Sequence, residues 1–150
     1  MLITRRLEFD AGHRIQDHRS QCRHLHGHRY AIEITLSGTV IRRQGAPEDG
    51  MVMDFADVRA IAGRVLVDKW DHAFLVHRGD ATLLEFLNSI PGHKTVVLEH
   101  TTTAENLAAT AFDMLDRAYH DVYGNQLCLQ KLRLYETPNC WVDVDRDPQE

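Results

Sequence analysis

The feature that most constrains the fold of this chain is a group of histidines near its N-terminus. His13 is followed, after a polar stretch, by the segment Cys22-Arg23-His24-Leu25-His26-Gly27-His28. Because His26 and His28 are two residues apart, their side chains leave the same face of a strand. His13 can join them from a neighbouring strand. The spacing therefore predicts two adjacent strands whose ends bring positions 13, 26 and 28 together.

Three neutral imidazoles with an open fourth position are the ligand set of a catalytic zinc, whereas structural zinc sites are closed by four ligands. The sequence has no C-x-x-C pair, so we expect an enzyme site with Zn²⁺. His24 would also lie on the same face of the strand as His26 and His28, and of these histidines we expect it not to be a metal ligand. Cys22 is either a fourth ligand or a free acid/base group, and we favour the second because a thiolate ligand would close the site.

Length and charge limit the classes of protein that fit. The chain has 150 residues and a net charge of -5, which fits a single domain over residues 1–150 with no general attraction to nucleic acid or membrane. A phosphorylated substrate would need a local basic patch, and Arg14, Arg19, Arg23 and Arg29 either form one or belong to a solvated loop. The three cysteines, without close pairing, and the absence of a signal-like or membrane-spanning run indicate the cytoplasm.

Hydrophobic periodicity predicts an α+β domain with a largely antiparallel sheet of four strands and two long helices. The expected strands are 7–13, 26–40, 127–137 with a bulge near Gln130-Lys131, and 140–145. One helix follows an Asp54 cap to about Lys69, and the other runs from a Thr102/Glu105 capping box to Gly124. Between them we expect a short helix over 81–87 and an extended piece over 95–98. The open sheet edges predict an oligomer.

Two other places have chemical character. Asp71-His72 follows the first helix and is either a general acid/base pair or a helix end where His favours the dipole. Glu136, at a strand end, either accepts N–H bonds from an amino-bearing heterocycle or is a solvated acid. The metalloprotease, base-deaminase, nucleophile-elbow, Walker and dinucleotide-binding motifs are missing from the sequence.

Six short motifs in register resemble the 6-pyruvoyl-tetrahydropterin synthase family. They are Phe9-x-Ala11-x-His13, Cys22-x-x-x-His26-Gly27-His28, Gly50-Met51-Val52-x-Asp54-Phe55, Asp71-His72, Thr103-x-Glu105-Asn106-Leu107-Ala108 and Tyr135-Glu136-Thr137. The match spans Leu7 to about Val144. It implies the tunnelling fold, a four-stranded antiparallel sheet with two helices on one face. In that family trimers close a barrel of strands and pair into homohexamers, with active sites between subunits.

The resemblance also implies residue roles. Zinc would be held by His13, His26 and His28, and Cys22 would be the proton-transferring thiol with Asp71 and His72 as acid/base partners. Glu136 would anchor the pterin ring, and Thr103 and Glu105 would belong to the substrate site. The segment 77–100 is longer than in the shortest members of the family.

The spacing C-x-x-x-H-x-H looks like that of the carboxy-forming bacterial members, which act in queuosine biosynthesis. The resemblance then implies conversion of 7,8-dihydroneopterin triphosphate to 6-carboxy-tetrahydropterin, with loss of acetaldehyde and triphosphate. Pyruvoyl-forming animal members, which eliminate triphosphate without carbon–carbon cleavage, typically have two more residues between the Cys and the H-x-H. A branch that cleaves dihydroneopterin has Glu in place of the Cys. A pyruvoyl-forming enzyme and a non-catalytic pterin- or metal-binding module stay open as alternatives.

Overall fold

The computed structural model describes residues 1–147, and two long antiparallel strands form its centre. These strands are β1 (Leu2–His13) and β2 (His26–Gly38). Their register places Phe9 opposite Tyr30, and the two rings stack with 5.3 Å between their centroids. Beyond this pair the inward positions of β2 form a fully buried apolar row, which consists of Ile32, Ile34 and Leu36. On the other side of the Phe9–Tyr30 pair, the same faces of β1 and β2 carry His13, His26 and His28.

Four further strands complete one six-stranded sheet in the order β4-β3-β1-β2-β5-β6. They are β3 (Ala73–His77), β4 (Thr95–Leu98), β5 (Leu127–Thr137) and β6 (Cys140–Asp145). β5 and β6 continue the antiparallel arrangement, whereas β3 pairs parallel with the end of β1 and β4 pairs parallel with β3. The α+β class is therefore confirmed, but the expected four-stranded antiparallel sheet is wrong, because the sheet is mixed and has six strands.

The missed strand β3 has no period-two pattern because both of its faces are covered. Leu75 belongs to the main core, whereas Val76 packs with Leu83 and Leu87 in a small second core. A strand buried on both faces reads as a continuous apolar run, which periodicity does not separate from other buried segments. β4 was expected as an extended piece, and its partner β3 makes it a strand of the sheet.

The first strand is also longer than expected, since it begins at Leu2 instead of position 7. Its first residues pair with the far half of β2, up to Ser37. Arg5 takes an inward-facing position in this half and interrupts the apolar alternation, which hid the strand from a reading of the sequence.

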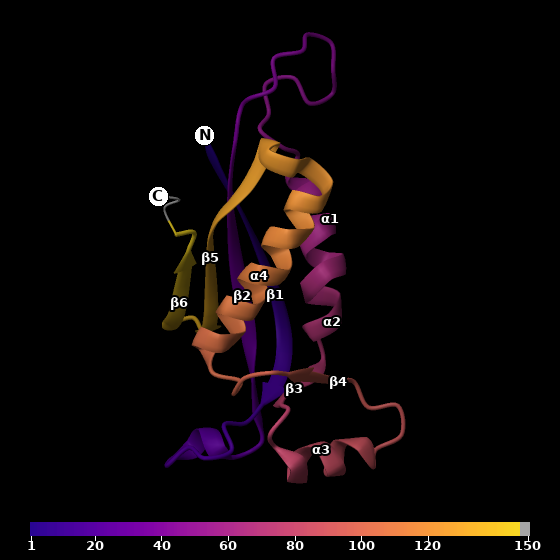
Figure 1. The fold of residues 1–150 in the computed structure, drawn as a ribbon, viewed down its shortest axis with the longest axis vertical. Coiled ribbons are helices and arrows are strands. Elements are labelled where there is room, and N and C mark those ends of the chain that lie inside the picture. Colours follow the sequence, from indigo (N-terminus) through magenta and orange to yellow (C-terminus); the bar gives the residue numbers. More distant parts are fainter. Residues whose placement is uncertain (148–150) are drawn as a thin grey trace.

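Two helical elements lie side by side on one face of the sheet (Figure 1). One is a continuous rod made of α1 (Phe55–Ala62), a π-helical turn (Gly63–Val67) and α2 (Asp68–Trp70). The other is α4 (Ala104–Tyr123), which is followed by a 3₁₀ turn over Gly124–Gln126. The short α3 (Ala81–Asn88) lies at one end of the sheet, as does a 3₁₀ turn over Gln21–Arg23.

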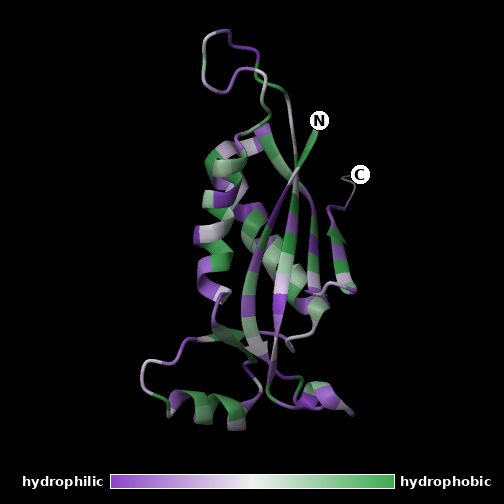
Figure 2. Cartoon of the chain, turned by 180° about the vertical axis from the view of Figure 1, so that it is seen from behind, coloured by the Kyte–Doolittle hydropathy of each residue, from purple (hydrophilic) through white to green (hydrophobic). Residues whose placement is uncertain are grey.

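The opposite face of the sheet is open in the part of the chain that the structure describes. Seen from that side, hydrophilic and hydrophobic residues alternate along the strands (Figure 2). None of the helices formed by residues 1–147 is long and apolar enough to pass through a lipid bilayer. The two expected long helices are present on one face, and the short helix expected over 81–87 is present as α3.

The predicted capping box of α4 is displaced by one residue. Thr103 is the N-cap, and its side chain accepts a hydrogen bond from the Asn106 backbone N–H at 3.4 Å. Thr102 is fully buried instead, and its carbonyl oxygen accepts a hydrogen bond from the His13 ring. The residue just before the N-cap of α4, Thr102, is therefore bonded to His13.

Two bulges shape β5. The register with β2 shifts between Thr35 and Leu36 and leaves Gln130 as the extra residue, as the change of hydrophobic phase predicted. The register with β6 shifts between Tyr135 and Thr137, so Glu136 is the extra residue there. A bulge redirects a side chain relative to its neighbours, and the second one lies at a candidate site residue.

We predict that Tyr119→Phe lowers the free energy of unfolding by about 1 kcal/mol, the usual net value of one hydrogen bond. The Tyr119 side chain is fully buried and its hydroxyl donates to the carbonyl oxygen of Val58 at 2.7 Å, which ties α4 to α1. Tyr123→Phe is the matched control, because the Tyr123 hydroxyl forms no hydrogen bond within residues 1–147. Urea denaturation measures both, and equal losses for the two variants would contradict the prediction.

Candidate metal centre and active site

Three histidines meet where β1 and β2 leave the apolar core. His13 lies directly opposite His26, and His28 lies opposite Ala11. The ring centroids of His13, His26 and His28 are 4.6–5.1 Å apart, and one ligand atom of each lies within 4.8 Å of the others. The predicted convergence of these three rings is therefore confirmed, and the group can hold a metal ion.

The tautomers of two rings are set by backbone carbonyl groups. His13 Nδ1 donates to Thr102 O at 2.8 Å, and His26 Nδ1 donates to His24 O at 2.6 Å. A carbonyl oxygen only accepts, so the proton of each neutral ring is on Nδ1 and the lone pair is on Nε2. A metal-binding imidazole usually has its other nitrogen bound in this way. His24 itself is exposed and contributes only its carbonyl group.

Two of the free nitrogens are buried without any partner. The Nε2 atoms of His13 and His28 have no hydrogen bond within residues 1–147. Burial lowers the pKa of His13 to about 4 and also lowers that of His28. Both imidazoles are therefore neutral near pH 7, and His13 presents an unpaired lone pair on Nε2, which is what a divalent transition metal requires. The donor set and its burial fit the expected zinc.

Cys22 lies on the loop that joins the two strands. It occupies the middle of the 3₁₀ turn Gln21–Arg23, and its carbonyl accepts from the Ile15 N–H at 2.8 Å, which closes the loop. The thiol is free and half-buried. The metal-binding group comprises the three histidines and does not include Cys22. The thiol is therefore outside the group of three histidines, and its acid/base role beside a metal ion stays a prediction.

Glu136 reaches the same place from β5. Its Oε1 lies 3.9 Å from His28 Nε2, and its side chain is 24% exposed. The bulge in β5 frees this residue from regular pairing with β6. The carboxylate is therefore beside the metal group and open to a ligand, which agrees with the predicted anchor position.

Tyr30 is a residue of this site to which the sequence analysis assigned no role. Its ring contacts the His28 and His13 rings edge-on, at centroid distances of 5.5 and 6.1 Å. The hydroxyl is buried without a partner among the described residues. Burial, and to a lesser extent the nearby Glu136 and Cys22 side chains, raise the pKa of Tyr30. Its place at the next same-face position after the H-x-H pair was the signal available in the sequence.

Thr103 and Glu105 lie at the start of α4, close in sequence to the Thr102 carbonyl that holds His13. The Thr103 hydroxyl acts as the helix cap. Glu105 is exposed in the first turn. Within residues 1–147 neither side chain bonds to the histidine group, so a substrate role for them stays a prediction.

Asp71 and His72 form a pair of their own at the start of β3. His72 Nδ1 is 2.9 Å from Asp71 Oδ2, and the His72 side chain is 76% exposed. The backbone N–H of Asp10 donates to Asp71 Oδ1, which is the main reason that the pKa of Asp71 is lowered. No hydrogen bond or ion pair joins the pair to Cys22 or to the three histidines in the described part of the chain.

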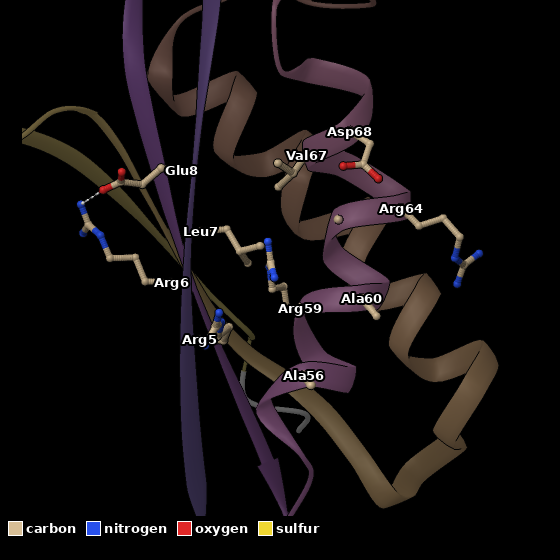
Figure 3. A pocket seen from close by; sticks show the side chains of 11 residues that line it. Arg5, Arg6, Leu7, Glu8, Ala56, Arg59, Ala60, Arg64, Val67 and Asp68 are labelled. Carbon is tan, nitrogen blue, oxygen red and sulfur yellow. Dashed lines mark hydrogen bonds and ion pairs between the residues drawn. The ribbon is translucent and has the colours of Figure 1, made fainter.

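The candidate basic patch is only partly free. Arg14 is held by Asp80 through two bonds of 2.6 Å, and Arg29 is held by Asp10 through two bonds of 3.0 Å. A cavity of about 510 Å³ lies beside the histidines and includes His72 in its lining. A larger one, of about 860 Å³, lies elsewhere, between β1 and α1 (Figure 3).

Comparison with known proteins identifies the family. The family model described as 6-pyruvoyl tetrahydropterin synthase matches residues 2–147. A 6-carboxy-5,6,7,8-tetrahydropterin synthase of Rickettsia bellii is 37% identical, over 94% of this chain and 97% of its own length. The protein of that name from Haemophilus influenzae is 35% identical, over 94% and 96%.

Solved structures share the fold. A protein of Wolinella succinogenes superposes with a TM-score of 0.78 at 22% identity, over 98% of each chain. The 6-pyruvoyl tetrahydropterin synthase of Caenorhabditis elegans does so with a TM-score of 0.67 at 23% identity, over 98% of this chain and 96% of its own. The match of the family model and the two relatives agree, and this chain belongs to the 6-pyruvoyl tetrahydropterin synthase family.

Proposed function

We propose that this chain is a zinc-dependent 6-carboxy-5,6,7,8-tetrahydropterin synthase, a carbon–carbon lyase. Its substrate would be 7,8-dihydroneopterin triphosphate, and its products 6-carboxy-tetrahydropterin, acetaldehyde and triphosphate. The curated relatives with 33–37% identity that carry this name support the carboxy-forming reaction over the pyruvoyl-forming one. By the same proposal the reaction serves queuosine biosynthesis in the cytoplasm, in keeping with the three free cysteines.

The observation that carries the proposal is the pair of buried, unpartnered Nε2 atoms on strands whose connecting loop carries a free thiol. A buried polar atom without a partner costs roughly 1–3 kcal/mol, so its presence calls for a ligand. The Nε2 atoms of His13 and His28 have this property, and the free thiol of Cys22 lies outside their group. This arrangement fits a catalytic ion with an open position better than a closed structural one.

The residues of the site would divide the work. Bound by His13, His26 and His28, zinc would act as a Lewis acid toward the side-chain hydroxyls of the substrate. Cys22 would take and return protons at its Sγ. The Glu136 carboxylate would accept N–H bonds from the pterin ring and so place the side chain of the substrate beside Cys22, a positioning effect.

The Asp71–His72 pair would act on the site of another copy of the chain. Its imidazole is 76% exposed, more than an acid/base group of a completed site would be. Under this proposal, neither the exposed Asp71–His72 pair nor the group of three histidines forms a complete active site within one chain. A homo-oligomer with active sites between subunits, a hexamer made of two trimers, supplies the missing parts.

The free side of β1 supports this assembly. Among residues 1–147, β1 pairs with β3 only at Ala11–His13, and Asp10 is bonded to Asp71 and His72, so the residues before Asp10 present a free strand edge on this side. The 860 Å³ cavity runs along this side, and small residues of the rod, Ala56, Ala60 and Gly63, keep it open (Figure 3). The outer strand β6 of a second copy would pair along this side, where its exposed Asp145 would meet Arg5 and Arg59 of the cavity lining.

Incubation with 7,8-dihydroneopterin triphosphate tests the reaction. We expect mass spectrometry to show 6-carboxy-tetrahydropterin and an aldehyde assay to show acetaldehyde in equal amount, because the reaction cleaves one carbon–carbon bond per turnover. A pyruvoyl product without acetaldehyde would replace this proposal with the pyruvoyl-forming one. A zinc-loaded protein that converts no pterin would point to a binding module.

Cys22→Ala should lower kcat by about 10²- to 10⁴-fold, the usual contribution of one general acid/base group. The zinc content should stay unchanged, because Cys22 is not part of the metal group. Cys140→Ala is the control, since Cys140 is an exposed cysteine on β6. A variant Cys22→Ala that turns over as fast as the control would remove the thiol from the mechanism.

His26→Ala should lose most of its zinc, measured by elemental analysis of the purified protein, because a three-ligand site loses a third of its donors. The matched control is His24→Ala, which keeps the backbone carbonyl that holds His26. Full zinc in both variants would show that the ion is held elsewhere.

The zinc content of the wild-type protein should also depend on pH in a defined direction. Proton competition for the ligands begins as the pH falls to the pKa of the imidazole. Because burial lowers the pKa of His13 to about 4, the wild-type protein should keep its zinc until the pH is well below 6.5, the ordinary histidine value. Release already complete at pH 6.5 would contradict this expectation.

A further inference from the structure

The turn that carries the Asp71–His72 pair has an unfavourable backbone conformation. Asp71 has φ −63° and ψ 129°, and His72 has φ 58°. These angles are those of a type II turn, whose third residue has positive φ and is usually Gly or Asn. His72 is the only non-glycine residue with positive φ in the described part of the chain. Such a conformation persists only where the surrounding contacts hold it, and it is common at functional sites.

β1 holds one side of this turn. The Asp10 backbone N–H donates to Asp71 Oδ1 at 2.9 Å, and the His72 N–H donates to the Asp10 carbonyl at 2.6 Å. Asp71 Oδ2 then remains for His72 Nδ1. This arrangement leaves His72 Nε2 free to exchange a proton with a substrate or a thiol.

Lys94 holds the other side. Its ammonium group donates to the carbonyl oxygen of Asp71 at 2.6 Å and to that of Asp68 at 2.7 Å. The Asp68 carbonyl belongs to the last turn of α2, where helix carbonyls lack partners. The Asp71 carbonyl is on the peptide whose orientation distinguishes a type II turn from a type I turn. A cation bound to this oxygen therefore favours the conformer in which His72 has positive φ.

We propose that Lys94 is a positioning residue for the reaction, which holds the Asp71–His72 pair in its active geometry by binding the carbonyl of the turn. The proposal rests on the acid/base role given to the pair under the proposed function. It also assigns a purpose to the long segment 77–100. That segment leaves β3, forms α3 and returns beside the start of β3, where Phe74 N–H donates to the Lys94 carbonyl at 3.0 Å. The return delivers the ammonium group to the end of α2.

The decisive variant is Lys94→Met, which keeps the length of the side chain and removes the charge and the donors. We expect kcat to fall by about 10- to 10²-fold, because a misplacement of about 1 Å can cost up to 10²-fold in rate, with KM and zinc content unchanged. Lys94→Arg, which retains a cationic donor, should recover most of the lost kcat. Lys69→Met is the control, because Lys69 is an exposed lysine of the same short helix α2 and forms no hydrogen bond or ion pair within residues 1–147.

A second measurement does not depend on turnover. Nitrogen-15 NMR of the histidine rings should show His72 protonated on Nδ1 in the wild-type protein and in Lys69→Met, and a mixture of tautomers in Lys94→Met. Lys94→Met indistinguishable from Lys69→Met in both kcat and tautomer would overturn the proposal. If the zinc-loaded wild-type protein converts no pterin but Lys94→Met still changes the His72 tautomer, the proposed function is refuted. The positioning of His72 by Lys94 is then still supported.

Discussion

The pairing of β1 with β2 is the interaction on which the rest of the structure depends. One register, fixed by the stacked Phe9 and Tyr30 rings inside the core, also sets His13 opposite His26. A slip of one residue would turn every side chain of one strand to the other face. The apolar row and the histidine group are therefore one continuous pattern of side chains on the same face. The free energy gained by burying the apolar row fixes the register, and the register positions the histidines.

The candidate site is built from contacts made at the end of that pattern. The backbone before α4 holds the His13 ring, the backbone of the connecting loop holds the His26 ring, and a bulge in β5 brings Glu136 to His28. Each of these groups comes from a different element, and the sheet brings them together. The Asp71–His72 pair is set by a different network, which ties the end of α2 to β1 and to Lys94.

The sequence was sufficient for the parts that depend on local pattern. The H-x-H spacing, the alternation after Tyr30 and the change of phase near Gln130 predicted the metal group, the long strand and the bulge. It was not sufficient where a residue depends on distant contacts. β3 has no periodicity because a second core covers it, and Lys94 resembles any surface lysine until its two carbonyl partners are known. Tyr30 is as buried as the other core residues. Only the structure shows that its ring contacts the histidine rings and that its hydroxyl has no partner within residues 1–147.

The connection between β1 and β2 has an evolutionary consequence. The register of the two strands is anchored on the core side of the histidines, so the loop between residue 13 and residue 26 does not determine that positions 13, 26 and 28 meet, although its His24 carbonyl orients the His26 ring. Loops tolerate insertions and deletions at a small entropic penalty. Descendants of one ancestral scaffold can therefore lengthen or shorten this loop and move its thiol relative to the three histidines, which gives natural selection a route to new chemistry without rebuilding the sheet.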